Sequence, residues 1–457
     1  MHLSNGRFWV KVQTSLNERG HLTKVEIFGL LVAVETDEHI DSIEVRLLEL
    51  EELANTAGIT VVSTLEQRKR RFDPATLVGQ GKVQEIVDAV SLHSPGIVVF
   101  DNELTPTQQR NLGEAMKCRV IDRTQLILDI FAQRARTREG KLQVELAQMS
   151  YLLPRLSMLY TKFERQQGGI GVRGGGGETK LELDRRKVRE RIIELQRELE
   201  DVKKKRRLQR KGRKDLPFPT ATLVGYTSAG KSTILNSLSD AAVLADKMLF
   251  STLDPTTRRV NLPDGRGILL TDTVGFIRNL PHDLVAAFRA TLEEVNDADM
   301  LLHIVDASSD EADRHRDTVI ETLENLGASN KPIVTVFNKR DAVEDLEALD
   351  HLMATIPNSC SISAKTGDGM DTLMDAIADV LKSLVRTLTV LLPYQRSDLL
   401  AKCHAHGIVH ALEYVEKGVQ LTVDLPDALF VELSPFDVTP KEQPFWLVEN
   451  EKPELED

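Results

Sequence analysis

Eight consecutive residues constrain the fold of this chain more than any others: Gly225-Tyr226-Thr227-Ser228-Ala229-Gly230-Lys231-Ser232. They follow a short apolar run, Ala221 to Val224, and precede a helix-like run, Thr233 to Leu238. This is the strand–loop–helix setting of a phosphate-binding P-loop. Its two glycines allow backbone angles that a Cβ forbids, so the loop amides can point inward around phosphate oxygens. The sequence therefore predicts a nucleoside triphosphate site in which Lys231 reaches the β- and γ-phosphates and Ser232 ligates Mg²⁺.

Two downstream motifs indicate which base is bound. Asn338-Lys339-Arg340-Asp341 follows the apolar run Ile333 to Phe337. A carboxylate at this place can accept two hydrogen bonds from guanine N1–H and N2–H₂, whereas adenine offers no such pair of donors. The stem of Lys339 can lie over the base, and Asn338 can brace the loop. Ser363-Ala364-Lys365, after the apolar Ile362, can supply a backbone amide to guanine O6, so we predict GTP and GDP as ligands.

A further motif, Asp272-Thr273-Val274-Gly275, follows the strand-like run Gly267 to Leu270. Asp272 can hold Mg²⁺ through water, and Gly275 can donate its N–H to the γ-phosphate. Thr252 is the preferred candidate for a second hydroxyl on Mg²⁺, with Thr256 as its rival. Together these segments resemble the signature motifs of the translation-factor-like class of P-loop GTPases.

The predicted site residues fall into three groups. Catalytic roles are predicted for Lys231, Thr252 and Gly275. Metal-binding roles are predicted for Ser232, Thr252 and, through water, Asp272. The residues predicted to bind the nucleotide are Gly225, Tyr226, Thr227, Ser228, Ala229, Gly230, Lys231, Ser232, Thr233, Phe250, Ser251, Thr252, Leu253, Asp254, Asp272, Thr273, Val274, Gly275, Asn338, Lys339, Arg340, Asp341, Ser363, Ala364 and Lys365.

Phe276 departs from the Ras-like pattern, which places a water-orienting Gln after the glycine. A phenyl ring cannot orient the attacking water, so intrinsic hydrolysis should be slow until a partner or a reordered loop completes the site. Alternatively, Phe276 packs with Ile277 against the core. The two interpretations are compatible.

Composition bounds the rest of the chain. A length of 457 residues is too great for one core and predicts about three domains. The net charge of −12 argues against nucleic-acid binding through bulk charge but leaves room for a local basic patch. The three cysteines are scattered, as in a reducing compartment. No signal peptide is evident, and the early apolar run Ile27 to Val34 is too short to cross a bilayer, so we expect a cytoplasmic monomer without a membrane span.

The N-terminal part alternates between strand and helix patterns and predicts an α/β domain of nucleotide- or ribosome-binding type over residues 1–122, with a largely parallel sheet. Val78 to Lys82 lacks P-loop spacing, and a tight turn is the preferred interpretation over a second phosphate loop. The expected strands are Val25 to Val34, Ile59 to Ser63, Gly96 to Phe100 and Arg119 to Ile121, and the expected helices are Ser42 to Ala57, Val83 to Ser91 and Thr105 to Met116.

Residues 123–214 are predicted to form an antiparallel helical hairpin. The first arm is expected from Leu126 to about Tyr160, kinked at Pro154, and the second from about Leu181 to Arg210. Apolar residues recur at spacings of three and four in both arms: Leu142, Leu146, Met149, Leu153 and Leu156 in the first, and Val188, Ile192, Leu195, Leu199 and Val202 in the second.

The joining segment, Gly168 to Glu178, is glycine-dense and longer than a hairpin turn requires. Glycines permit close backbone approach, and arginines such as Arg173 suit phosphates or stacked bases. We predict a polyanion contact at this tip, with a flexible solvated turn as the alternative. At the other end of the second helix, the basic run Lys203 to Arg207 separately favours a polyanion contact, with a solvated face as the alternative.

The P-loop domain is predicted over residues 215–386, closed by a helix from Asp371 to Leu384. A small C-terminal α/β domain is predicted over residues 387–457, with a helix at Ser397 to His406. The fold class is therefore α/β: an N-terminal α/β domain, a helical hairpin, a P-loop GTPase domain with a mainly parallel sheet, and a small C-terminal α/β domain.

Over most of its length the chain resembles the HflX family of ribosome-associated GTPases. The resemblance rests on long strings: Asp122 to Ala135, Glu139 to Leu146, Gly168 to Arg173, Glu178 to Thr179 with Leu181 to Glu182, Asp184 to Arg186, and Leu253 to Arg259. It implies binding to the large ribosomal subunit, with rRNA near the peptidyl-transferase region contacted by the tip at Gly168, Arg173 and Gly177.

The resemblance also implies GTP-dependent splitting of stalled or idle ribosomes into subunits. The family's tip usually reads Arg-Gly-Pro-Gly-Glu, whereas this chain reads Arg173-Gly174-Gly175-Gly176-Gly177-Glu178, without the proline and one residue longer. Two other functions are compatible with the sequence: a GTPase that acts on maturing large subunits, and an RNA-binding scaffold that GTP orders.

Overall fold

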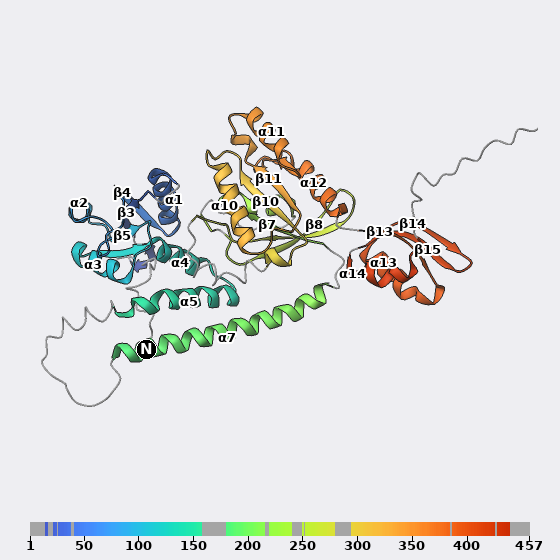
Figure 1. Cartoon of the computed structure of the whole chain (residues 1–457), viewed down its shortest axis with the longest axis horizontal. Coiled ribbons are helices and arrows are strands. Elements are labelled where there is room, and N and C mark those ends of the chain that lie inside the picture. The colour runs from blue at the N-terminus through green and yellow to red at the C-terminus, as the bar shows by residue number, and fades with distance from the viewer. Residues whose placement is uncertain are drawn as a thin grey trace, which may run out of the picture.

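The structure is a computed structural model. It describes residues 14–16, 22–24, 26–37, 41–157, 180–214, 219–239, 249–250, 252–278, 294–383, 386–425 and 427–438. An N-terminal α/β domain, a helical hairpin, a P-loop domain and a C-terminal domain follow one another along the chain (Figure 1). The P-loop domain lies in the middle of the view, with α5 and α7 running beneath it and the N-terminal domain.

The N-terminal domain is built on a parallel sheet with the strand order β4-β3-β5-β6. Residues of α1 and α4 share a buried apolar cluster with one face of this sheet, and residues of α2 and α3 share another cluster with the opposite face. The bounds are β1 Thr14–Leu16, β2 Leu22–Lys24, β3 Ile27–Glu35, α1 Ile43–Thr56, β4 Ile59–Arg68, α2 Gln80–His93, β5 Ile97–Phe100, α3 Pro106–Met116, β6 Arg119–Asp122 and α4 Arg123–Arg134.

Caps explain where several of these helices begin. The Ser42 hydroxyl accepts from the N–H of Val45 at the start of α1. Thr105 and Gln108 form a capping box at the start of α3, where Pro106 occupies the first helical position. The tight turn predicted at Val78 to Lys82 is not present, because Gly79 is extended and α2 already begins at Gln80.

The prediction of one continuous first arm from Leu126 is wrong. The chain leaves the helical conformation at Ala135, and a new helix, α5 (Arg138–Leu152), begins after the N-cap Thr137. The buried side of α4 packs against the N-terminal sheet, whereas α5 forms the arm. Pro154 lies in the short 3-10 segment η1 (Leu153–Arg155) that follows α5.

The second arm is α7 (Lys180–Lys214). Leu142 near the start of α5 packs with Leu195 and Leu199, while Leu156 after its end packs with Val188. The two apolar stripes therefore meet in antiparallel fashion, as the spacing predicted. The glycine-rich tip lies outside the described residues.

The P-loop domain has a sheet with the order β12-β11-β10-β7-β9-β8, in which only the edge strand β8 is antiparallel to its neighbour. The predicted motifs follow the carboxyl ends of β7, β9, β11 and β12, where open α/β sheets bind ligands. The bounds are β7 Thr220–Gly225, α8 Lys231–Leu238, β8 Thr256–Asn261, β9 Gly267–Asp272, β10 Met300–Asp306, α10 Ala312–Asn325, β11 Ile333–Asn338, η2 Arg340–Ala342, α11 Leu346–Thr355, β12 Ser359–Ser361 and α12 Met370–Ser383.

The C-terminal domain has an antiparallel sheet with the order β13-β15-β14. Its core includes Leu388, Val390, Leu399, Cys403 and Leu421. The bounds are β13 Arg386–Leu392, η3 Tyr394–Arg396, α13 Ser397–His406, β14 Ile408–Val415, β15 Gly418–Leu425, α14 Asp427–Leu433 and η4 Ser434–Phe436. The predicted fold class is thus confirmed. Among the described residues, every helix is too short or too polar to cross a membrane.

Candidate functional site

The P-loop joins β7 to α8, and its glycines are required where they stand. Gly225 and Gly230 have φ angles of +155° and +98°. A Cβ on Gly230 would lie 2.2 Å from Nδ2 of Asn338. The same Nδ2 donates to the Ala229 carbonyl at 2.8 Å. The first residue of the predicted guanine motif therefore braces the phosphate loop directly.

Lys231 is buried at the start of α8 and points into the loop. Its ammonium group donates to the carbonyls of Gly225 (3.0 Å) and Tyr226 (2.8 Å). Burial lowers the pKa of Lys231 to about 8, although the carboxylate of Asp272 acts in the opposite direction. A Cβ on Gly275 would lie 3.0 Å from Lys231 Nζ. The loop after β9 thus closes against the P-loop, and this close approach requires glycine.

Three oxygen-bearing side chains meet beside Lys231. The Ser232 hydroxyl donates to Asp272 Oδ2 at 2.6 Å, and the Thr252 hydroxyl reaches the same oxygen at 2.8 Å. The two hydroxyls are themselves 2.8 Å apart. Hard oxygen donors are the ligands that Mg²⁺ prefers. Thr256, the rival candidate, begins β8 and does not line the cavity described below, so the geometry favours Thr252 of the two alternatives.

The second carboxylate oxygen of Asp272 also indicates that the cluster of Ser232, Thr252 and Asp272 can bind a cation. This oxygen, Oδ1, is buried and has no hydrogen-bond partner among the described residues. Burial raises the pKa of the Asp272 carboxyl, while Lys231 and the hydrogen bond from Ser232 oppose that shift. A buried carboxylate oxygen without a partner costs free energy that a hydrated cation would recover. The residues present therefore fit Mg²⁺.

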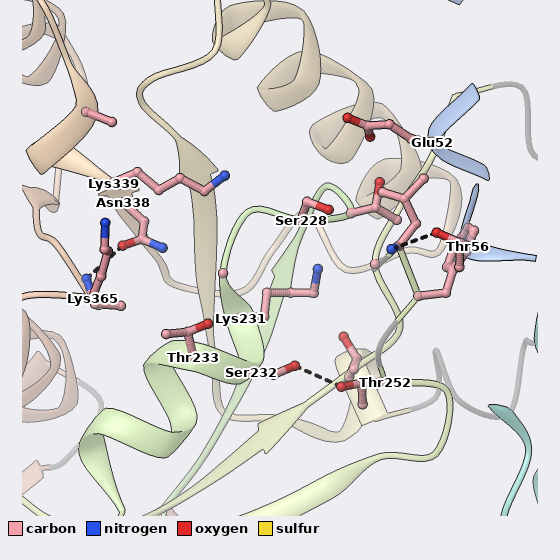
Figure 2. A pocket seen from close by; sticks show the side chains of 18 of the residues that line it. Glu52, Thr56, Ser228, Lys231, Ser232, Thr233, Thr252, Asn338, Lys339 and Lys365 are labelled. Atoms are coloured by element: carbon pink, nitrogen blue, oxygen red, sulfur yellow. Dashed lines mark hydrogen bonds between the residues drawn. The ribbon is translucent and has the colours of Figure 1, made fainter. Parts of the chain in front are cut away.

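A cavity of about 680 Å³ runs across the front of this site. In Figure 2, Asn338, Lys339 and Lys365 lie at one side, Ser228, Lys231 and Ser232 in the middle, and Thr56 at the other side. Residues from the P-loop, the segment before β8 and both guanine motifs line the cavity: Thr227, Ser228, Gly230, Lys231, Ser232, Thr233, Leu249, Phe250, Thr252, Thr273, Gly275, Asn338, Lys339, Asp341, Ala342, Ala364 and Lys365.

The guanine motifs are held to each other by side-chain hydrogen bonds. Asp341 Oδ1 accepts from the Ser363 hydroxyl at 2.6 Å, and this bond is the main cause that lowers the pKa of the Asp341 carboxyl. Asn338 Oδ1 accepts from the Ala364 amide at 3.0 Å. The Lys339 ammonium pairs with Asp306 at 2.5 Å. Asp341 therefore presents an ionised, oriented carboxylate to the cavity, as reading guanine requires.

Several predicted site residues lie away from the cavity. Leu253 and Val274 are buried in the apolar core. The Arg340 guanidinium is 3.9 Å from Asp368. The carboxylate of Asp254 faces Thr137 and not the cavity, which corrects the expectation of a nucleotide contact. Ser251 lies outside the described residues.

Phe276 is buried in the core, with 2% of its surface exposed. Its backbone joins the P-loop: the Phe276 N–H donates to Gly225 O at 3.1 Å, and its carbonyl accepts from Thr227 N at 2.8 Å. The packing interpretation of Phe276 is therefore confirmed, and slow intrinsic hydrolysis stays a prediction.

The N-terminal domain also lines the cavity, although none of the residues predicted for the nucleotide site comes from it. Glu52, Asn55 and Thr56, all from α1, form one of its walls. Thr56 Oγ1 accepts from the Leu249 amide at 3.2 Å. Desolvation is the main cause that raises the pKa of Glu52, with Lys339 acting in the opposite direction. The helical pattern of α1 is an ordinary amphipathic one, so nothing local marks these residues.

An ionic network also joins the two domains beside the site. Arg123, at the start of α4, pairs with Glu49 at 2.5 Å and with Asp101 at 2.9 Å within the N-terminal domain. Its guanidinium also donates to the Arg278 carbonyl of the P-loop domain at 3.4 Å. The Arg278 guanidinium, just after Phe276, pairs with Asp41 at 2.9 Å. The N-terminal domain thus holds the segment that follows β9, and because the two arginines are buried, removing one of their carboxylate partners would leave a buried charge without its partner.

Comparison with known proteins places this geometry in a family. Models described as GTP-binding GTPase N-terminal, GTP-binding GTPase Middle Region, 50S ribosome-binding GTPase and HflX C-terminal domain match residues 44–132, 134–213, 220–339 and 348–434. GTPase HflX of Lacrimispora saccharolytica is 45% identical over 420 residues, covering 92% of this chain and 98% of that protein. GTPase HflX of Escherichia coli K12 is 45% identical over 382 residues, covering 83% and 89%.

A GTP-binding protein from the archaeon Sulfolobus solfataricus, solved in complex with GDP, is 24% identical and covers 78% of this chain and 99% of its own, with a TM-score of 0.44. The chain is a GTPase that binds GTP and GDP together with Mg²⁺. The 45% identity to these relatives over most of the chain, together with the four matched family models, establishes that the chain belongs to the HflX family.

Proposed function

We propose that this chain acts as a cytoplasmic monomer that binds the large ribosomal subunit and uses GTP to separate stalled or idle ribosomes into subunits. The match to a 50S ribosome-binding GTPase model supports the ribosome as partner. The observation that carries the proposal is the hairpin. The 35 residues of α7 extend about 50 Å, and α7 packs along α5 to form an antiparallel arm. Such an arm suits contact with RNA at a distance from the site.

In this proposal the roles at the cavity follow from the contacts described. Lys231 and the Gly275 N–H stabilise charge on the γ-phosphate, and Asp341 reads guanine. Ser232 and Thr252 would hold Mg²⁺, and Asp272 would act through water. When bound there, the cation would supply positive charge that offsets the negative charge of the phosphates. Because Phe276 stands where the Ras-like pattern has the water-orienting Gln and packs into the core, hydrolysis is slow alone and accelerates on the ribosome.

Sucrose-gradient sedimentation tests the proposal. Joined ribosomes incubated with excess protein and a non-hydrolysable GTP analogue should convert to subunits. The matched variant lacks residues 168–177, with the arms bridged by a short turn, and should bind the analogue but leave ribosomes joined. Persistence of joined ribosomes with saturating wild-type protein would contradict splitting. Selective binding to precursor large subunits would then favour the assembly function.

Turnover assays separate the enzyme from the scaffold. GTP hydrolysis should be slow for the protein alone and strongly stimulated by purified large subunits. Ser232→Ala should abolish both rates, because it removes an oxygen from the Asp272 cluster. Fast hydrolysis that ribosomes leave unchanged would contradict the argument from Phe276, and a single turnover in all conditions would favour the scaffold.

A further inference from the structure

The segment before β8 has two ends with different partners. Thr252 faces the nucleotide site, where its hydroxyl reaches Ser232 and Asp272. Asp254, two residues later, faces the hairpin. Its Oδ2 accepts from the backbone N–H groups of Arg136 (2.9 Å) and Thr137 (2.8 Å), and its Oδ1 accepts from the Thr137 hydroxyl. One carboxylate therefore accepts three hydrogen bonds from the two residues that precede α5.

The place where Asp254 binds is the start of a helix. Thr137 is the N-cap of α5, and its Oγ1 accepts from the Gly140 amide at 3.0 Å. A negative charge is favourable at this end of a helix, where backbone N–H groups are unpaired. A Cβ on Gly140 would lie 2.4 Å from Asp254 Oδ1, so the first turn of α5 requires glycine for the carboxylate to approach.

Helix α5 is in turn fixed to α7. Arg191 of α7 pairs with both oxygens of Glu145 in α5, at 2.8 and 3.1 Å. Arg138, in the first turn of α5, is 3.2 Å from Glu198. The apolar cluster of Leu142, Leu195 and Leu199 lies between the two helices. A displacement of the start of α5 therefore displaces the hairpin.

The link from nucleotide to hairpin is short. A single residue, the buried Leu253, separates Thr252 from Asp254. Two residues span at most about 7 Å, so the two side chains cannot move independently over larger distances. Phe250 adds a second restraint, because its ring packs against Phe131 of α4 with centroids 4.7 Å apart.

We propose that Asp254 is a positioning residue: through it, the segment that carries Thr252 sets the position of α5, and so of the hairpin, according to the bound nucleotide. When the γ-phosphate and Mg²⁺ hold Thr252, Asp254 holds the N-terminus of α5. When GDP replaces GTP, this hold is weakened. The coupling lies within this chain and depends on nucleotide binding, not on the ribosome.

Hydrogen exchange of the full-length protein tests the coupling. The amides of residues 136–142 are compared with GDP and with a non-hydrolysable GTP analogue. In the wild type, protection should be about tenfold greater with the analogue. In Asp254→Ala this difference should vanish, while affinity for the analogue stays within about threefold. Asp254→Asn should restore the difference, because its amide oxygen still accepts from the two N–H groups and its amide nitrogen can donate to Thr137.

Two further variants make the test specific. Asp345→Ala removes a carboxylate from the N-terminus of another helix, α11, where Asp345 is the N-cap and its Oδ1 accepts from Ala348 N at 3.0 Å. It should leave the nucleotide dependence at 136–142 intact. Gly140→Ala acts from the opposite side and should reduce that dependence, even if Asp254→Ala does not fold. The inference is overturned if the wild type shows equal protection with both nucleotides, or if Asp254→Ala or Gly140→Ala retains the full difference. The exchange experiment contains no ribosomes, so its outcome does not depend on whether the protein splits ribosomes.

Discussion

The phenol hydroxyl of Tyr226, inside the phosphate-binding loop, donates a hydrogen bond to the carboxylate of Glu49 in α1 of the N-terminal domain. The same oxygen accepts from the Arg278 amide at 3.1 Å. The Tyr226 ring stacks on His315 of α10, with centroids 3.9 Å apart. Burial and the Glu49 carboxylate raise the pKa of Tyr226, so the hydroxyl remains a donor at physiological pH. One side chain thus joins the P-loop, the segment after β9 and the N-terminal domain.

Tyr226→Phe should weaken the contact between the P-loop domain and the N-terminal domain without changing the lining of the nucleotide cavity. The change removes the donor to Glu49 and leaves the Arg278 amide without its partner, at a cost of about 1–3 kcal/mol. We expect a lower thermal midpoint, and faster hydrogen exchange in α1 and residues 276–278 together. The matched control is Tyr394→Phe, which removes an exposed hydroxyl whose partner, Val415 O, lies within the C-terminal domain. Equal effects of both variants would mean that the Tyr226–Glu49 bond does not couple the domains.

Glu52→Gln should strengthen nucleotide binding. The Glu52 carboxylate lines the cavity from α1, and in Figure 2 it lies on the same side as Thr56. Removing this negative charge should raise affinity by roughly 3- to 10-fold at low salt, more for GTP than for GDP, because GTP carries the larger negative charge. Glu51→Gln is the control, since Glu51 does not line the cavity. Affinities measured with fluorescent nucleotides at two salt concentrations check the prediction, and unchanged GTP affinity in Glu52→Gln would contradict it.

Much of the fold could be predicted because its signals are local. The strands and helices around the P-loop follow from apolar runs and glycine positions within a few residues of one another. The antiparallel pairing of α5 and α7 follows from matched stripes, such as Leu142 against Leu195 and Leu199. The start of α5 was missed because helix-forming residues continue across Ala135, and the cap at Thr137 is a weaker signal than the apolar period.

The contacts between domains could not be predicted. Glu49 meets Tyr226 across 177 residues of sequence, and Asp254 meets Thr137 across 117. Each of these residues is compatible with an ordinary solvated surface, and only the packing of one domain on another brings them together. Asp254 was predicted to contact nucleotide because its neighbours in the sequence were. Its carboxylate instead accepts from the backbone N–H groups of Arg136 and Thr137, at the N-terminus of α5.

Asp341→Asn should change base choice. The ionised carboxylate, oriented by Ser363, can accept from both guanine donors, whereas an amide presents its own N–H₂ to one of them. GTP affinity should fall by about 100-fold or more, while affinity for xanthosine triphosphate should fall far less or rise. Competition between the two nucleotides for one fluorescent probe measures this. Equal losses for both would show that Asp341 does not read the base.

His303 should make the P-loop domain sensitive to acid. It lies in β10 with 1% of its surface exposed, and neither ring nitrogen has a hydrogen-bond partner among the described residues. Burial lowers its pKa to about 4, and the positive charges of Arg316 and Lys231 act in the same direction. In an unfolded chain the pKa of histidine is about 6.5.

The sign of the effect follows from these two values. Between pH 6.5 and about 4 the unfolded chain binds a proton at His303 that the folded chain does not, so this residue destabilises the fold as pH falls through that window. The slope from one such group is at most about 1.4 kcal/mol per pH unit. His303→Leu removes it and replaces two unpaired nitrogens with apolar atoms, which should be neutral or stabilising at pH 7. The thermal midpoint of the variant, relative to wild type, should therefore rise steadily from pH 7 to pH 5. His351→Leu, which removes an exposed histidine from α11, controls for loss of a histidine as such. A constant difference between His303→Leu and wild type across this range would show that His303 takes up its proton equally in the folded and unfolded states.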